Sequence, residues 1–184
     1  MSSTKELEHL HVGWEEYHSM IEQLALRIWD SGYRFESLLC LARGGLRVGD
    51  VLSRIFDLPL GILAASSYRE AAGTQQGSLD IAEFITITGG GLRGKVLLVD
   101  DLVDSGVTLI RVIEHLKARF PSVSEVRTAV LWYKACSTYV PDFYVQHLPT
   151  SPWIHQPFEE YDSLRPTQLA ARLRAKGRAA EGSD

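Results

Sequence analysis

The fold follows from one stretch, Val96-Leu97-Leu98-Val99-Asp100-Asp101-Leu102-Val103-Asp104-Ser105-Gly106-Val107-Thr108. Its first four residues are apolar, and such a run predicts a strand that is buried on both faces, as in a parallel sheet. Two adjacent carboxylates, Asp100 and Asp101, stand at the carboxyl end of this strand. A short turn comes next, and residues 109–120 have the pattern of a helix that ends at Pro121.

The turn after the acid pair has the chemistry of a phosphate site. The N-terminus of a helix offers free backbone N–H groups and the positive end of the helix dipole, and both attract anions. Ser105 and Thr108 add hydroxyl donors. Carboxylates only accept hydrogen bonds, so Asp100 and Asp101 suit the two hydroxyls of a ribose. The stretch therefore predicts a site for a ribose phosphate, with the sugar on the acid pair and the phosphate in the turn.

Two other interpretations of this turn fit less well. Acids that merely cap a turn would explain a single Asp better than they explain Asp100 and Asp101 followed by Asp104 in one strand, turn and helix. A Walker A phosphate loop ends in Gly-Lys-Ser or Gly-Lys-Thr, which this turn lacks.

Strands and helices alternate outward from this stretch, and the predicted fold class is therefore α/β, with a mainly parallel twisted sheet flanked by helices. In such sheets ligands bind at the carboxyl ends of the strands. The expected helices lie within residues 14–28, 46–56, 109–120 and 167–176, the expected strands are 37–42, 59–65, 81–88, 95–101, 126–132 and 143–147, and residues 153–162 are expected to be irregular.

Composition excludes some classes of protein. The formal net charge of −4 shows no basic surplus of the kind that nucleic-acid binders carry. Cys40 and Cys136 make neither a disulfide framework nor a zinc site, and Cys40, in an apolar run, is expected to be buried. The polar first ten residues do not resemble a signal peptide, and no apolar run has the length of a membrane span. We therefore expect a cytoplasmic location.

The stretch over residues 96–108 resembles the signature with which type I phosphoribosyltransferases bind phosphoribosyl pyrophosphate (PRPP). Ala42-Arg43-Gly44-Gly45-Leu46 resembles their pyrophosphate-binding loop, and Ser66-Ser67-Tyr68 resembles the start of their flexible lid. Lys134 follows a strand where the 6-oxopurine enzymes carry a base-contacting lysine. Trp153-Ile154-His155-Gln156-Pro157-Phe158-Glu159 resembles the base-binding hood of the bacterial xanthine-guanine enzymes, and the resemblance extends over about residues 12–162.

The resemblance implies an activity, a metal and partners. The enzyme would transfer ribose 5-phosphate from PRPP to guanine, xanthine or hypoxanthine in purine salvage, releasing pyrophosphate and a nucleoside monophosphate. Mg²⁺ is expected, held mainly by oxygens of PRPP and by Asp100 and Asp101, directly or through water. No nucleic-acid partner is expected, and the chain would form a homo-oligomer, a dimer or a tetramer.

The resemblance also assigns roles to residues, and Asp100, Asp101 and Asp104 are the catalytic candidates, with Asp104 exchanging the proton at purine N7. PRPP would contact Asp100, Asp101, Asp104, Ser105, Gly106, Val107 and Thr108. Arg43 and Gly44 would bind pyrophosphate through backbone N–H groups, in a loop that often contains a non-proline cis peptide. Ser66, Ser67 and Tyr68 would begin a lid over residues 66–80 that excludes water. The base would contact Lys134, Trp153, Ile154 and Glu159.

The sequence departs from the pattern of the xanthine-guanine enzymes at four positions. Val107 replaces a Gly, His155 an acidic residue, Phe158 a Trp and Glu159 an Asp. Because His155 and Glu159 would lie close to the base, the preferred purine stays open. Two alternatives also stay open: a phosphoribosyltransferase for another base, and a PRPP-sensing regulator of the same fold that binds RNA or DNA.

The expected organisation is one domain over residues 1–176, with its core in about 12–147 and the hood in about 148–165, followed by a disordered tail over 177–184. We expect Trp153 to stack on the purine, because the prolines around it place it on a loop. The periodic positions of Trp14, Trp29 and Trp132 predict core residues, and a solvated helix face is expected for Arg172, Arg174, Lys176 and Arg178.

Overall fold

The computed structural model describes residues 8–67 and 79–181. By its internal contacts the chain divides into two compact units, Met1–Tyr17 with Pro152–Asp184, and His18–Ser151. The second and larger unit holds the central sheet, and the first holds a two-stranded sheet and the C-terminal helices.

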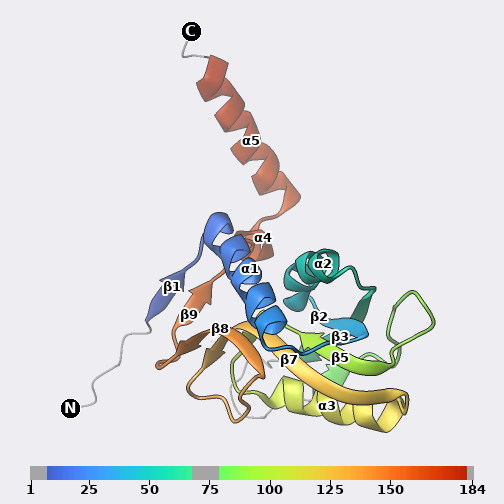
Figure 1. Ribbon diagram of the computed structural model, residues 1–184. Helices are drawn as coiled ribbons and strands as arrows, with labels where there is room; N and C mark the ends of the chain where they lie inside the picture. The colour runs from blue at the N-terminus through green and yellow to red at the C-terminus, as the bar shows by residue number, and fades with distance from the viewer. Residues whose placement is uncertain (1–7, 68–78, 182–184) are drawn as a thin grey trace. The chain divides into compact units, whose positions relative to one another are not determined.

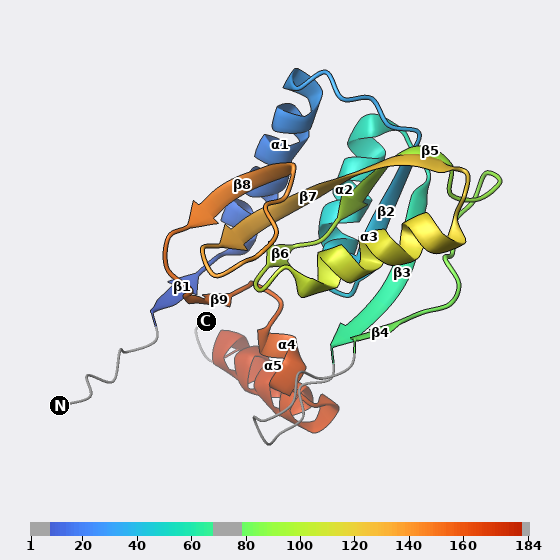
Figure 2. The same ribbon diagram turned by 90° about the horizontal axis from the view of Figure 1, so that it is seen from below.

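The larger unit is built on a mostly parallel sheet with the strand order β4-β3-β2-β5-β7-β6, and β8 pairs with the opposite edge of β7 from β6 (Figure 1, Figure 2). β4 runs antiparallel to β3, whereas the pairs among β2, β3, β5, β6, β7 and β8 are parallel. The strands are β2 (Ser37–Ala42), β3 (Leu60–Ser67), β4 (Leu79–Ile81), β5 (Gly94–Val99), β6 (Leu102–Val103), β7 (Val123–Lys134) and β8 (Phe143–Leu148).

Helices cover both faces of this sheet. Figure 2 shows α3 (Val107–Arg119) on one face and α2 (Gly45–Phe56) on the other, on the same side as α1 (Trp14–Asp30). Residues alternate along β5, so Val96 and Leu98 pack in the cluster that contains Leu109 and Leu116 of α3. Because both faces are covered, Val96–Val99 are all buried, as the apolar run predicted.

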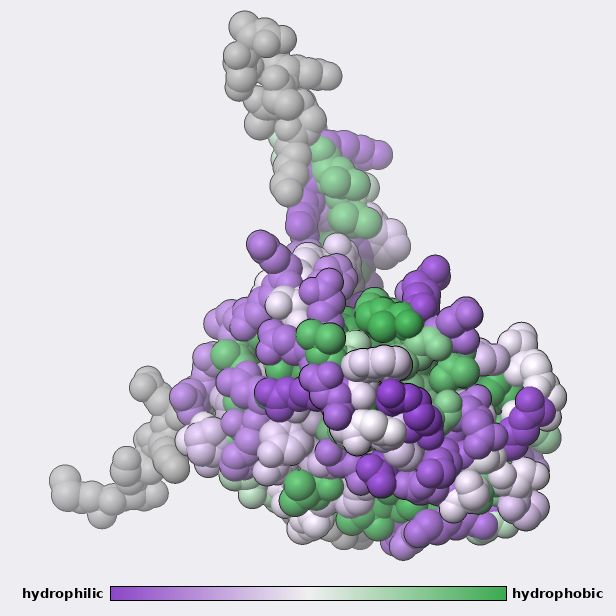
Figure 3. All heavy atoms as spheres, in the orientation of Figure 1, coloured by the Kyte–Doolittle hydropathy of each residue, from purple (hydrophilic) through white to green (hydrophobic). Residues whose placement is uncertain are grey.

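The smaller unit has a parallel pair of short strands, β1 (His9–His11) and β9 (Trp153–His155). It continues into α4 (Glu160–Ser163) and α5 (Pro166–Glu181), so α5 extends past Gly177 into the segment for which a tail was expected. Figure 3 shows apolar as well as hydrophilic side chains along α5. Arg172 and Arg174 are exposed there, and so is Leu173, at 58%.

Several expected elements differ in the structure. The strand expected over residues 81–88 is reduced to β4 and one bridge between Ile62 and Thr86, because the backbone bends away between them. Residues 153–162 are not irregular, since β9 and α4 lie there. The short strands β1 and β6 were not expected, because two or three residues carry no detectable period.

Two of the tryptophans expected in the core are on the surface. Trp14 and Trp29 are 45% and 55% exposed, and the guanidinium of Arg34 lies 4.2 Å from the centre of the Trp29 ring. The amphipathic period placed both residues too far toward the buried face of α1, whereas Trp132 and Cys40 are fully buried as predicted. No helix in the described part of the chain is long and apolar enough to cross a lipid bilayer.

Leu98 of β5 is completely buried in the middle of the sheet. We therefore expect a large loss of stability when its side chain is shortened. Leu98→Ala should lower the free energy of unfolding by about 2–5 kcal/mol, because it removes apolar contacts and leaves a cavity. Leu26→Ala, at an exposed position of α1, is the control and should change it by less than about 0.5 kcal/mol. Chemical denaturation measures both, and equal effects would contradict the packing described for β5.

Candidate active site

Asp100 and Asp101 stand at the carboxyl end of β5, and backbone hydrogen bonds to β7 hold them there. The N–H of Asp100 donates to the carbonyl oxygen of Ala129 over 3.1 Å. The carbonyl oxygen of Asp101 accepts from the N–H groups of Leu131 and Trp132, at 3.0 and 3.2 Å. Both acidic residues are only partly buried, so the strand presents two carboxylates at its end.

The loop between β2 and α2 packs directly on this acid pair, and two glycines allow the close approach. A Cβ atom on Gly44 would overlap the carboxylate of Asp101. A Cβ atom on Gly45 would lie 3.0 Å from the Cα atom of Asp100, whose carboxylate accepts a hydrogen bond from the Gly45 N–H. The peptide bond between Ala42 and Arg43 is cis. The predicted pyrophosphate loop and the predicted ribose site are therefore one continuous surface.

Asp100 and Asp101 lie so close together that the charged form of Asp100 is disfavoured. The pKa of Asp100 is raised well above its ordinary value of 3.8. The main cause is burial of its carboxylate, and the second is the negative charge of Asp101. The N–H of Asp101 donates to the Asp100 carboxylate over 3.0 Å, which offsets part of this cost. Such a pair suits a ligand that brings hydroxyl donors or positive charge to it.

The turn predicted to bind phosphate, which contains residues 104–106 and is called the phosphate turn below, ends at the N-terminus of α3. Gly106 has a φ of +85°, in the left-handed region that glycine tolerates best, and it immediately precedes the first helical residue. The N–H of Val107 donates to Oγ of Ser105 over 3.4 Å. The strand, turn and helix predicted from residues 96–108 are thus present, with the first helical N–H groups close behind the acids.

Lys134, the last residue of β7, pairs with Asp104 in the phosphate turn. Its Nζ lies 3.4 Å from Oδ1 of Asp104, and the lysine is only 7% exposed while the Asp104 side chain is 47% exposed. The sequence pointed to both residues separately but carried no signal that they meet. A buried ammonium and a half-exposed carboxylate therefore stand side by side, one able only to donate hydrogen bonds and the other only to accept them.

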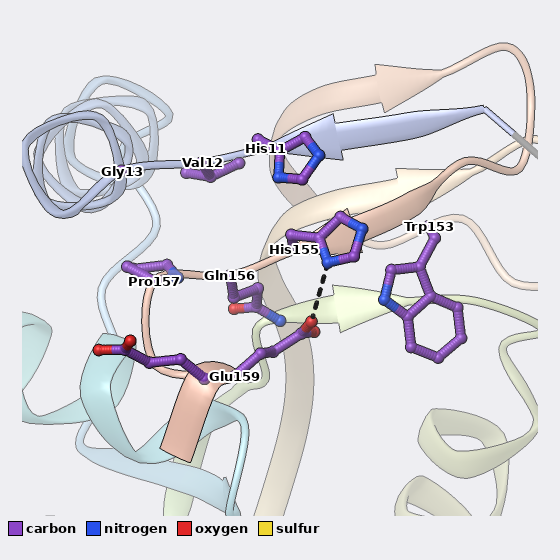
Figure 4. Close-up of a pocket in the computed structure, with 9 residues that line it drawn as sticks. His11, Val12, Gly13, Trp153, His155, Gln156, Pro157 and Glu159 are labelled. Carbon is purple, nitrogen blue, oxygen red and sulfur yellow. Dashed lines mark ion pairs between the residues drawn. The ribbon is translucent and has the colours of Figure 1, made fainter. Parts of the chain in front are cut away.

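In the smaller unit, residues 11–13 and residues of the predicted hood line a cavity of about 680 Å³. Its lining residues are His11, Val12, Gly13, Trp153, His155, Gln156, Pro157, Glu159 and Glu160 (Figure 4). His155 Nδ1 lies 3.7 Å from a carboxylate oxygen of Glu159. The His155 ring also stacks on that of His11, with centroids 4.3 Å apart. Trp153 is partly exposed at this cavity, whereas the side chain of Ile154 is buried away from solvent.

Comparison with known proteins identifies the family. Residues 13–163 match the model of the phosphoribosyl transferase domain. The chain belongs to the phosphoribosyltransferase family. Over 149 residues it is 31% identical to a xanthine-guanine phosphoribosyltransferase of Idiomarina loihiensis, an alignment that covers 80% of this chain and 85% of that protein.

Solved structures of other phosphoribosyltransferases share the fold. A purine phosphoribosyltransferase of Pyrococcus horikoshii is 31% identical with a TM-score of 0.69, over 86% of this chain and 99% of that one. A xanthine-guanine-hypoxanthine phosphoribosyltransferase of Helicobacter pylori is 30% identical with a TM-score of 0.67, over 84% and 96%. The predicted family and the predicted α/β fold class are confirmed.

The predicted lid lies mostly outside the described residues, Tyr68 among them. Ser66 and Ser67 are the last residues of β3 and pair in register with Asp80 and Leu79 of β4. The lid therefore stays a prediction, and the structure describes only the strands from which its ends leave. Within residues 8–67 and 79–181, no group of three or more His, Cys, Asp or Glu side chains is arranged to hold a metal ion.

The raised pKa of Asp100 predicts that this residue lowers the stability of the ligand-free enzyme. Because its pKa is higher in the folded than in the unfolded state, its favourable contribution is complete only below pH 3.8 and is lost as the pH rises. Asp100→Asn should therefore raise the melting temperature at pH 7, and the gain should shrink toward pH 4. Thermal unfolding without ligand measures this, with Asp50→Asn on the exposed side of α2 as the control. A lower melting temperature of Asp100→Asn at pH 7 would contradict the account.

Proposed function

We propose that the protein transfers ribose 5-phosphate from PRPP to a 6-oxopurine, with release of pyrophosphate. The observation that favours a 6-oxopurine as the base is the ion pair between Lys134 and Asp104. A 6-oxopurine presents an oxygen acceptor at position 6 and, beside it, a ring N–H at position 7. These two groups match a donor and an acceptor that stand 3.4 Å apart. The named relatives from Idiomarina and Helicobacter support the same choice.

The proposed chemistry is a substitution at the anomeric carbon of PRPP. N9 of the purine forms a bond to C1 of the ribose, the bond from C1 to the pyrophosphate oxygen breaks, and the pyrophosphate keeps that electron pair. The proton on purine N7 passes to the Asp104 carboxylate, which has further acceptor positions beside the one that faces Lys134. Lys134 donates to the oxygen at position 6 and balances negative charge there.

Asp100 and Asp101 would hold the ribose hydroxyls and face the positive charge that grows on the ring as pyrophosphate leaves. The same charge relieves the unfavourable burial that raises the pKa of Asp100. Arg43 and Gly44 would bind the pyrophosphate, and residues Ser105–Thr108 the 5-phosphate, through backbone N–H groups at the starts of α2 and α3. Trp153, Ile154 and Glu159 would contact the base from the hood, and the lid would exclude water.

Magnesium fits the acid pair, because Mg²⁺ prefers carboxylate and phosphate oxygens and keeps several of its waters. Oxygens of PRPP would hold most of it, with Asp100 and Asp101 as further ligands, directly or through water, and it would supply charge that stabilises the leaving pyrophosphate. We further propose that the enzyme acts in purine salvage in the cytoplasm and forms a homo-oligomer.

Replacing Lys134 tests the choice of base. Lys134→Met keeps the length of the buried side chain and removes its donors, so kcat/KM for guanine, xanthine and hypoxanthine should fall about 10- to 100-fold, the value of a hydrogen bond to a charged group. Adenine, which has an amino group at position 6, should stay a poor substrate because Met supplies no acceptor. Lys117→Met on the exposed side of α3 is the matched control. Unchanged oxopurine kinetics, or a gain of adenine turnover, would exclude this role for Lys134.

Replacing Asp104 tests the proton transfer. Asp104→Asn keeps the shape of the side chain but cannot take the N7 proton, so kcat should fall by about 10²–10⁴-fold while the protein stays folded. Initial rates with saturating PRPP and base measure it, and Asp50→Asn again serves as the control. If kcat stays within about twofold of the wild-type value, Asp104 is not the proton acceptor.

A further inference from the structure

The connection between β7 and β8, residues 135–142, packs against the phosphate turn. Thr138 makes two hydrogen bonds to a single atom of that turn, the carbonyl oxygen of Ser105. Its backbone N–H and its Oγ1 hydroxyl both donate to this oxygen, each over 3.0 Å. A carbonyl oxygen has two acceptor positions, so both are used by one residue.

The same connection also lies beside the residues on either side of Ser105, namely Gly106 and Asp104. Gly106 is buried, and a Cβ atom there would lie 2.7 Å from Cβ of Tyr139 and 2.8 Å from Oγ of Ser137. On the other side of Ser105, the thiol of Cys136 lies 3.6 Å from Oδ1 of Asp104. Three successive residues of the phosphate turn, 104–106, are therefore contacted by one segment.

Partly buried hydrogen bonds anchor this segment to the sheet. The Asp142 carboxylate accepts from the N–H and from Oγ1 of Thr128, each over 2.9 Å, and the Asp142 N–H donates back to Oγ1 over 3.0 Å. Because the Thr128 hydroxyl proton is used in this way, the Tyr139 hydroxyl donates to Oγ1, over 3.2 Å. Thr128 is fully buried in β7 and lies opposite Leu98 of β5, the strand that ends in the acid pair.

The direction of the Ser105 carbonyl group determines the direction of the Gly106 N–H group, because both belong to the same planar peptide. The Ser105–Gly106 peptide bond is trans, so its C=O and N–H groups point to opposite sides. With the Ser105 oxygen held by Thr138, the Gly106 N–H points away from the connection. Gly106 also tolerates the left-handed conformation in which successive N–H groups of a turn converge on an anion.

We propose that Thr138 is a positioning residue for the phosphate site: by holding the Ser105 carbonyl it directs the Gly106 N–H to the 5-phosphate of the substrate. The inference rests on the proposed function only in that a 5-phosphate binds in this turn. It does not depend on which base is used. In this role Thr138 acts through the backbone of the turn, by way of the Ser105 carbonyl.

Thr138→Val tests this role, because Val has the shape of Thr and keeps the backbone N–H but lacks the hydroxyl donor. KM for PRPP should rise about two- to tenfold, as expected for the loss of one neutral hydrogen bond. KM for the base and kcat should stay within about twofold, and Thr138→Ser should restore the wild-type KM for PRPP. Val140→Ala, at an exposed position of the same connection, is the matched control and should leave all three constants unchanged.

Calorimetric titration with ribose 5-phosphate separates this inference from the proposed function. Weaker binding of ribose 5-phosphate by Thr138→Val than by the wild-type protein, with restoration by Thr138→Ser, would support the role of Thr138 even if no 6-oxopurine were turned over. Equal affinities, or no binding to the wild-type protein, would overturn it. A rise in KM for PRPP and for the base together, with a lower melting temperature, would also overturn it, because that pattern indicates a general loss of structure.

Discussion

The β2–α2 loop packs closely against the end of β5, and this contact sets the geometry of the site. It exists because Gly44 and Gly45 have no side chains where the carboxylate of Asp101 and the backbone of Asp100 stand. Any larger residue would separate the two loops, and the backbone N–H groups at the start of α2 would no longer lie beside the acids. A ligand that carries a diphosphate next to a ribose needs this adjacency. The glycine pair thus joins two parts of the sequence into one binding surface.

Strand β7 supports that surface from the other side. It receives the backbone hydrogen bonds of the acid pair, it ends in the buried Lys134, and through Thr128 it anchors the segment that holds the phosphate turn. The cost of the arrangement is electrostatic, since burial and the Asp101 charge both raise the pKa of Asp100. We propose that positive charge on the substrate relieves this cost.

Patterns in the sequence predicted the features that depend on residues close together in the chain. The apolar run of β5, the acids after it and the turn before α3 all depend on neighbours in the chain, and the predicted fold class was correct. The pairing of Lys134 with Asp104 and the hydrogen bonds from Thr138 to Ser105 join residues about 30 positions apart, and no period or motif reports such contacts. Trp14 and Trp29 show the limit of periodicity, because a residue at the border of an amphipathic face can turn to either side.

We propose that the ion pair at the end of β7 recognises a 6-oxopurine beside a bound PRPP. The most direct measurement is the release of pyrophosphate by the wild-type protein from PRPP and Mg²⁺ with guanine, xanthine, hypoxanthine, adenine or orotate as the base. We predict release with at least one of the three 6-oxopurines and a kcat/KM for adenine lower by about 10⁴-fold, as for sites built around one specific hydrogen bond. A preference for adenine or orotate, or release with none of the five bases, would contradict it.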